Sequence, residues 1–168
     1  MNGTPHGRYL GIDLGGRRIG LALREDSAAA HGLPTMLRRP SALADAERLR
    51  TIAAEGRVTE LVVGLPLNSD GSVGPQASTT LRWATEVAYA LQLPITFVDE
   101  RYSSQRAEAS LGRAARGSNG GAPGPARREA RRAAIDQEAA RLILEDAMNP
   151  ELLIDPAVLV VDTRESAI

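Results

Sequence analysis

The stretch "RYLGIDLGGRRIGLALRE", residues 8–25, decides the fold class of this chain. It contains two apolar segments, at residues 9–14 and 19–23, and the adjacent glycines Gly15 and Gly16 stand between them. Apolar runs separated by a short glycine-containing turn are typical of a β-hairpin. We therefore expect the folded part of the chain to begin with two antiparallel strands.

Helices and strands are expected to alternate after this hairpin and a third short strand at residues 31–37. The first helix is predicted between an N-cap at Ser41 and a stop at Gly56, and Ser103 or Ser104 is the expected N-cap of the third. The other predicted elements are buried strands at 59–67 and 94–98 and helices at 76–93, 103–114 and 127–148. This order favours an α/β fold in which helices cover the faces of a mixed sheet.

The length of 168 residues favours one domain, which we place at residues 8–149, followed by a C-terminal segment at 150–168. Because the chain has no cysteine, a disulfide or a zinc–cysteine framework is excluded. The first residues lack the pattern of a secretory signal, and no long apolar run follows, so we expect a soluble cytoplasmic protein without membrane contact. The composition of "RGSNGGAPGP", residues 116–125, predicts a flexible loop.

The charge is distributed unevenly along the chain. The net charge is −1, but residues 101–132 hold eight arginines and two acids, so this region carries +6 and the remainder −7. A basic region of this kind suits an anionic polymer, and it is also what a solvated helix face would show. Aromatic residues make up only 3% of the chain, which argues against a base-stacking platform.

Three acids stand where apolar residues are expected. Asp13 lies between Ile12 and Leu14 in the first strand, and Glu100, with Asp99 beside it, ends the strand "PITFV". Asp136 shares one helix face with a stripe of apolar residues: Ala139, Ala140, Ile143, Leu144 and Ala147. A buried carboxylate needs a hydrogen-bonding partner, a cation or a raised pKa.

Each acid taken alone has a structural explanation. Asp13 could brace the glycine turn, Asp136 could cap the last helix, and Glu100 could pair with Arg101. Three such acids from separate segments together favour a site for Mg²⁺ or Mn²⁺, because these hard cations prefer oxygen ligands. Two such ions about 4 Å apart can promote phosphodiester hydrolysis.

Four motifs resemble the YqgF, or RuvX, family of RNase H-like nucleases, and the resemblance extends from Tyr9 to Met148. They are "GIDLGGRRIGLAL" at 11–23, "VVGLPLNSDGS" at 62–72, "VDERYSS" at 98–104 and "AIDQEAARLIL" at 134–144. The resemblance implies a five-stranded sheet of order 3-2-1-4-5 with helices on both faces. It also implies that Asp13, Glu100 and Asp136 are the catalytic, metal-binding acids.

The same resemblance implies a nuclease that trims the 5′ end of pre-16S ribosomal RNA. A Holliday junction resolvase acting on branched DNA is the alternative in the same class, and symmetric cleavage of a junction would require a homodimer. Asn68 either contacts a sugar-phosphate backbone or braces its own loop as an Asx turn. The other candidate substrate contacts are Arg17, Arg101, Ser103, Ser104, Arg131 and Arg132, and Asp99 is the candidate to replace Glu100 if that residue points away.

Two other classes remain open at this point. A nucleic-acid-binding module could keep the fold without catalysis, although all three acids are present. The segment "GIDLGG" also resembles the first phosphate loop of actin-like proteins and sugar kinases. Those proteins close two such domains over a nucleotide, whereas this chain has the length of one.

Overall fold

A single mixed sheet forms the centre of the computed structural model, which describes residues 7–112 and 120–159. The sheet order is β3-β2-β1-β4-β5, as predicted. Strands β1 to β3 form an antiparallel meander, and β1, β4 and β5 run parallel to one another. The bounds are β1 (Arg8–Leu14), β2 (Arg18–Glu25), β3 (His31–Leu37), β4 (Glu60–Leu65) and β5 (Ile95–Asp99).

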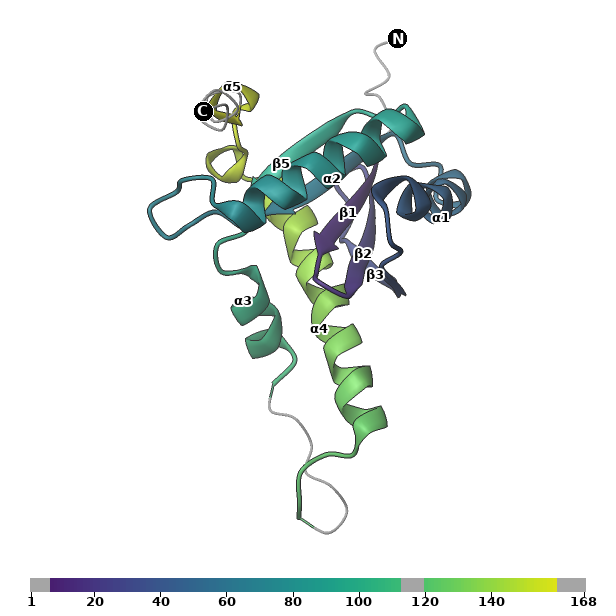
Figure 1. Cartoon of the computed structure of the whole chain (residues 1–168), viewed down its shortest axis with the longest axis vertical. Coiled ribbons are helices and arrows are strands. Elements are labelled where there is room, and N and C mark those ends of the chain that lie inside the picture. The colour runs from purple at the N-terminus through teal and green to yellow at the C-terminus, as the bar shows by residue number, and fades with distance from the viewer. Residues whose placement is uncertain (1–6, 113–119, 160–168) are drawn as a thin grey trace.

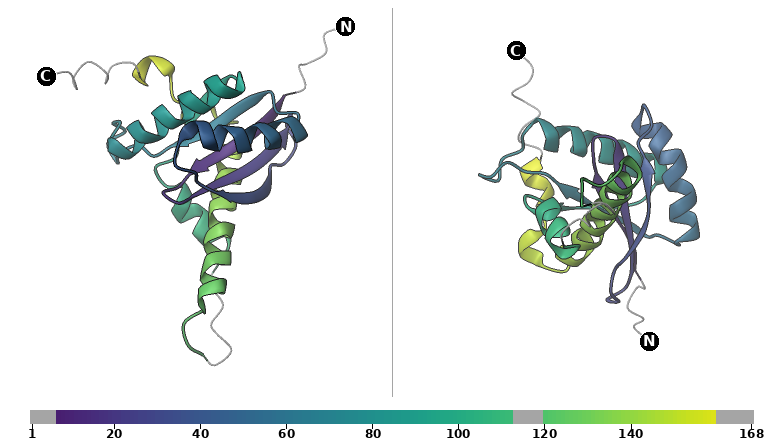
Figure 2. Two further views of the ribbon diagram at one scale, coloured as in Figure 1. Left: turned by 45° about the vertical axis from the view of Figure 1, so that its right-hand side comes forward. Right: turned by 90° about the horizontal axis from the view of Figure 1, so that it is seen from below.

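Helices cover both faces of this sheet, which Figure 2 shows from two directions. Helices α1 (Ala42–Glu55) and α2 (Pro75–Leu91) pack on the face that carries Leu10 and Ile12, and together they bury the larger part of the core. Helix α4 (Pro125–Asp146) lies on the opposite face, with the short helix α3 (Ser103–Ser110) beside it (Figure 1). Because side chains alternate along a strand, Gly11 and Asp13 of β1 belong to the α4 face.

Small residues let α4 approach the sheet closely. Gly11, Ala22 and Gly32 are neighbours across β1, β2 and β3, and they form a row beneath the helix. A Cβ atom at Gly20 would lie 2.0 Å from the backbone oxygen of Asp136, a distance that no packing tolerates. The close contact at Gly20 therefore fixes the distance between α4 and the sheet at Asp136.

The first helix has the predicted caps. Ser41 accepts a hydrogen bond from the Ala44 amide at 3.2 Å, and Gly56 ends α1. Asp45, which is fully buried, accepts from Trp83 Nε1 at 2.9 Å and from the Arg39 amide at 2.8 Å. Asp45 therefore links α1 to α2. The two donors provide the hydrogen bonds that a buried carboxylate requires.

The α3–α4 hairpin projects below the sheet in Figure 1. Helix α3 ends at Ser110 and α4 begins at Pro125. The predicted end of α3, at residue 114, and the predicted start of α4, at residue 127, therefore both lie too far along the chain. Proline suits the first turn of a helix because the missing N–H has no partner there. Of the predicted loop at 116–125, residues 116–119 lie outside the described part of the chain.

The C-terminal segment is attached to β5. The 3-10 helix η1 (Pro150–Leu152) leads to Leu153, which bridges to Val98, and the Ile154 amide donates to the Phe97 carbonyl at 3.0 Å. A four-residue helix, α5 (Pro156–Leu159), follows, and residues 160–168 lie outside the described part. None of the helices in residues 7–112 and 120–159 is long and apolar enough to cross a membrane.

Candidate active site

Three elements bring the predicted acids to one edge of the sheet. Asp13 lies near the carboxyl end of β1, Glu100 follows β5 directly, and Asp136 is on α4 above Gly20, the register partner of Asp13. Parallel strands end at the same edge of a sheet, which is where ligands bind in open α/β folds. The side chains of Asp13 and Glu100 hydrogen-bond to each other, and the charge of Asp136 acts on Asp13.

Asp13 and Glu100 form a pair of carboxyl groups whose pKa values are both raised. Burial, followed by the nearby charge of Asp136, raises the pKa of Asp13 to about 6, against the hydrogen bond from Glu100. Burial and the charge of Asp13 raise the pKa of Glu100 well above its usual range. Two carboxyl groups this close share a proton because both cannot ionise cheaply. A cation that replaces this proton would relieve the repulsion.

Two neighbours fix the position of the Glu100 side chain. The buried hydroxyl of Ser103 donates to Glu100 Oε1 at 2.5 Å. On the other side, a Cβ atom at Gly64 would lie 2.3 Å from Glu100 Oε2, so only glycine leaves room for the carboxyl group. Glu100 therefore points inward to Asp13, and Asp99 is not needed as its replacement.

Three neighbouring acids are each neutralised by an arginine. Asp99 binds Arg101 at 2.7 Å, Asp136 binds Arg18 at 2.7 Å, and Asp146 binds Arg106 at 2.6 Å. Among the described residues, Asp13 and Glu100 have no arginine or other cationic partner. Among the acids near these strand ends, this pair is therefore the one without a cationic partner in the described part of the chain.

The donor set fits a hard divalent cation, but one donor is engaged elsewhere. Carboxylate oxygens are the ligands that Mg²⁺ and Mn²⁺ prefer, and Asp13 and Glu100 present them side by side. Across residues 7–112 and 120–159, no three His, Cys, Asp or Glu side chains already stand together as a group that could hold a metal ion. The third acid, Asp136, is hydrogen-bonded to Arg18 instead.

The candidate substrate contacts near the strand ends have different surroundings. Arg17 is exposed in the β1–β2 turn. Asn68 donates to Ser72 Oγ at 2.9 Å, so it braces its own loop, and Arg101 links Asp99 to the Ser69 carbonyl of that loop. The prediction of a serine N-cap for α3 is wrong at Ser103, because this hydroxyl serves Glu100 and Tyr102 is the cap residue. The backbone of Ser104 lies in α3, and its side chain is outside the described part.

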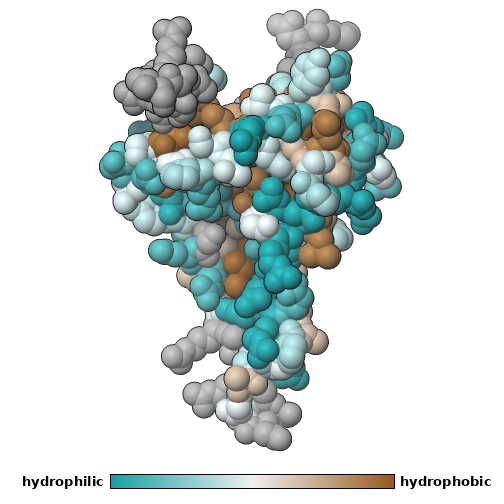
Figure 3. Space-filling model, in the orientation of Figure 1, coloured by the Kyte–Doolittle hydropathy of each residue, from teal (hydrophilic) through white to brown (hydrophobic). Residues whose placement is uncertain are grey.

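Arg131 and Arg132 lie about one turn of α4 before Asp136. They line a groove of about 820 Å³ between α3 and α4, together with Arg127, Arg128 and Glu108. Arg131 donates to the Gly112 carbonyl at 2.5 Å and so joins the two helices, whereas Arg132 is exposed. In the view of Figure 3, the projecting part of α4 presents mostly hydrophilic side chains.

Sequence reasoning missed Arg18 and Asp146. Arg18 stands two residues before Gly20 on β2, so it shares the α4 face and reaches Asp136. The charge of Asp146 raises the pKa of Glu100, although its own arginine, Arg106, screens it. The spacing of Asp146, three residues after the buried Ile143, was the signal available for its inward position.

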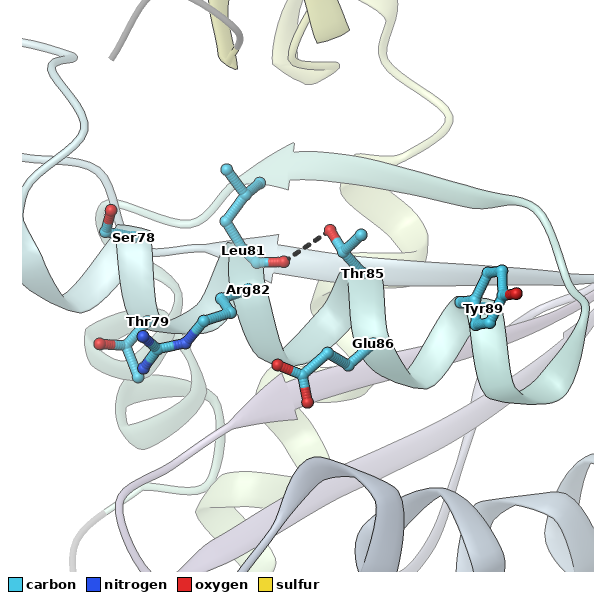
Figure 4. Close-up of a pocket in the computed structure, with 7 residues that line it drawn as sticks. All are labelled: Ser78, Thr79, Leu81, Arg82, Thr85, Glu86 and Tyr89. Carbon is cyan, nitrogen blue, oxygen red and sulfur yellow. Dashed lines mark hydrogen bonds between the residues drawn. The ribbon is translucent and has the colours of Figure 1, made fainter. Parts of the chain in front are cut away.

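A second groove, of about 620 Å³, runs along the outer side of α2 (Figure 4). Its lining side chains all come from that helix: Ser78, Thr79, Leu81, Arg82, Thr85, Glu86 and Tyr89. Arg82 and Glu86 are its charged members, and α2 lies on the face of the sheet opposite to α4. This groove is therefore separate from the carboxyl pair.

Comparisons with known proteins identify the family of this chain. A family model described as "RuvX: Holliday junction resolvase" matches residues 7–150. A relative from Synechococcus sp., named "Putative pre-16S rRNA nuclease", is 41% identical over 148 residues, which cover 88% of this chain and 92% of the relative. One of the same name from Myxococcus xanthus is 39% identical over 147 residues, which cover 85% and 90%.

A solved structure shares the fold. It is titled "T. thermophilus RuvC in complex with Holliday junction substrate", and it aligns with a TM-score of 0.52 at 15% identity, covering 89% of this chain and 100% of that one. At this identity the likeness concerns the RNase H-like fold alone. The family match, by contrast, spans the whole sheet and all three acids. On that match and the identity to its relatives, the chain belongs to the RuvX family.

Proposed function

We propose that this protein is a metal-dependent nuclease that hydrolyses phosphodiester bonds at the 5′ end of pre-16S ribosomal RNA. The observation that carries the proposal is the Asp13–Glu100 pair, which is largely buried, shares a hydrogen bond and has no arginine partner in the described part of the chain. An unfavourable pair of this kind marks a candidate functional site, and a bound cation would relieve its repulsion. The nuclease names of its relatives support the reaction class.

Asp13 and Glu100 would hold Mg²⁺ or Mn²⁺, and Asp136 would join them on leaving Arg18. The cation supplies an activated water and stabilises the leaving oxygen. Glu100 must lose its proton to become a ligand, so binding releases a proton to solvent. Ser103 keeps the carboxyl group of Glu100 in place during this change, because its hydroxyl donates to Oε1.

The arginines of the α3–α4 groove would hold the nucleic acid. Arg132 is exposed and Arg131 fastens α4 to the end of α3, so the hairpin offers positive charge on a fixed support. Structured RNA is read mainly through its shape and phosphates, which suits a basic groove with few aromatic residues. Arg17 would add a phosphate contact on the other side of the acids. A ribosomal RNA precursor as substrate implies a cytoplasmic location.

The second candidate is cleavage of Holliday junctions. The description of the matching family model favours it. Junction resolution by paired cuts would require two active sites, and hence a homodimer.

Incubation with defined substrates tests the proposal. The purified protein is mixed with end-labelled pre-16S RNA or a four-way DNA junction, with EDTA, Mg²⁺ or Mn²⁺, and the product ends are mapped. We expect metal-dependent cleavage at the 5′ end of the precursor, lost in Asp13→Asn and Asp136→Asn and kept in Glu86→Gln, a control on the distant α2. Cleavage of the junction alone would favour the second candidate. No cleavage of either would contradict the nuclease assignment.

A further inference from the structure

The third acid of the site is already held by a cation of the protein itself. Arg18 Nε donates to Asp136 Oδ2 at 2.7 Å, and Arg18 Nη1 donates to Glu129 Oε1 at 3.1 Å. The pair is largely buried, with 16% of the Arg18 side chain and 20% of the Asp136 side chain exposed. Glu129 is 57% exposed, so the contact with Asp136 is the stronger of the two.

Arg18 differs from the other arginines that neutralise acids near the site. Arg101 and Arg106 are more exposed, at 34% and 48%, and they bind Asp99 and Asp146 at its margin. Arg18 binds the acid whose charge acts directly on Asp13. It is held there by the backbone, because β2 places Arg18 on the α4 face and Gly20 sets the height of Asp136.

Arg18 Nε occupies Oδ2 of Asp136, and the guanidinium already compensates the charge of this carboxylate. A divalent cation that binds Asp136 draws on the same negative charge and must displace Arg18 wherever it uses Oδ2. As long as Arg18 holds Asp136, only Asp13 and Glu100 remain as a group of two. The described residues contain no three-acid group that could hold a metal ion.

We propose that Arg18 competes with the divalent cation for Asp136 and thereby sets the cation concentration at which the site fills. This inference rests on the proposed metal-dependent function. Arg18 is thus a positioning residue, which keeps the negative charge of Asp136 compensated in the metal-free protein. A cation that binds Asp136 must first break the ion pair with Arg18, and for a pair of this exposure this weakens cation binding about fivefold. Without Arg18 there is no ion pair to break, so this loss of affinity disappears.

Cation binding is measured directly, without the cleavage reaction. Mn²⁺ is titrated into the metal-free protein, and its dissociation constant is obtained by calorimetry and by the rise in melting temperature. Arg18→Gln should lower the dissociation constant about fivefold or more and should melt earlier than the parent without metal. Arg18→Lys, which keeps the charge but not both hydrogen bonds, should lie between them and also serves if the glutamine variant folds poorly. Arg82→Gln, the same change on an exposed side chain of the distant α2, should leave the constant unchanged.

A second background separates competition from simple repulsion. In Asp136→Asn there is no carboxylate at this position for which Arg18 and the cation compete. Adding Arg18→Gln to this variant should therefore leave its Mn²⁺ affinity unchanged, whether that affinity is weak or not detectable. An equal gain in affinity in both backgrounds would mean that Arg18 only repels the cation, and would overturn the inference.

The Mn²⁺ titrations distinguish an error in the role of Arg18 from an error in the metal site itself. If the parent binds Mn²⁺ and Arg18→Gln binds it no more tightly, the competition is wrong and the nuclease proposal stands. If neither the parent nor any variant binds Mn²⁺, the metal site itself is wrong, and the role of Arg18 is overturned with it.

Discussion

The carboxyl group of Glu100 donates a hydrogen bond to that of Asp13 at the ends of β5 and β1, two strands that are separated in the sheet by β4. Gly64 of β4 leaves the space through which Glu100 reaches across. Ser103 holds the other oxygen of Glu100. The pair is therefore built over three strands and the first residue of α3.

Asp13→Asn should stabilise the metal-free protein, and more at pH 8 than at pH 4. The pKa of Asp13 is raised from 3.8 to about 6, so its charge costs no stability below about pH 3.8 and the full amount above about pH 6. Each pKa unit corresponds to about 1.4 kcal/mol. Asparagine has no charge to acquire, and its oxygen still accepts from Glu100.

Thermal unfolding in EDTA between pH 4 and 8 measures this effect. The parent should lose melting temperature across the interval relative to the variant. Glu86→Gln removes an exposed charge on α2 and should follow the parent. A variant with the same pH dependence as the parent would show that Asp13 ionises without cost.

The strands and the inner acid pair could be predicted from local sequence patterns, whereas the order of the strands in the sheet followed from the family resemblance. Alternation of apolar residues defines the strands, and an acid at the end of an apolar run is visible without coordinates. Arg18 could not be identified in this way. Whether Arg17 or Arg18 faces α4 depends on where the turn ends, and a shift of one residue exchanges the two faces of a strand. The prediction began the second strand at residue 19, whereas β2 begins at Arg18.

Burial alone does not distinguish a functional acid from a structural one. Asp45 is more completely buried than Asp13, yet its donors come from Trp83 and Arg39. These partners are distant or irregularly spaced in sequence, so only the fold reveals them. Asp13 differs because its hydrogen-bond partner is another acid. The identity of the partner, which is a tertiary property, separates the two roles.

Gly20→Ala should destabilise the protein and reduce cleavage together. The added Cβ would lie 2.0 Å from the backbone oxygen of Asp136, and backbone atoms of a packed helix cannot move aside cheaply. Overpacking of this kind costs roughly 1–3 kcal/mol, and α4 would carry Asp136 away from Asp13. Gly16→Ala is the matched control, because nothing lies within 4 Å of its Cβ position. Denaturant unfolding and the cleavage assay should both distinguish the variants, and equal stability of the two would contradict the close contact.

Arg132→Ala should weaken nucleic-acid binding and reduce its salt dependence. Arg132 is exposed in the α3–α4 groove, and each phosphate contact contributes about 0.7 to 0.9 to the slope of log affinity against log salt. Arg82→Ala removes an exposed arginine from α2 on the other side of the molecule and should leave the slope unchanged. Binding is measured in EDTA over a range of salt concentrations. Equal slopes for parent and Arg132→Ala would mean that this arginine only solvates the helix.

Ser103→Ala should make cation binding more dependent on pH. The Ser103 hydroxyl donates to Glu100 Oε1 at 2.5 Å, and this hydrogen bond lowers the pKa of Glu100 against the larger effects of burial and of Asp13. Without it the pKa of Glu100 rises further, so the proton that a cation must displace is held more tightly. Mn²⁺ affinity should fall several-fold near pH 7, as expected for one lost hydrogen bond of about 1 kcal/mol, and should recover as the pH rises.

Ser103→Thr keeps the hydroxyl and should behave like the parent. Ser110→Ala provides the matched control in the same helix, because it removes a similar bond, to Glu138 at 2.8 Å, away from the pair. Calorimetric titrations between pH 6 and 9 decide the matter: a loss of affinity that stays constant over this range would show that Ser103 orients Glu100 without affecting its proton.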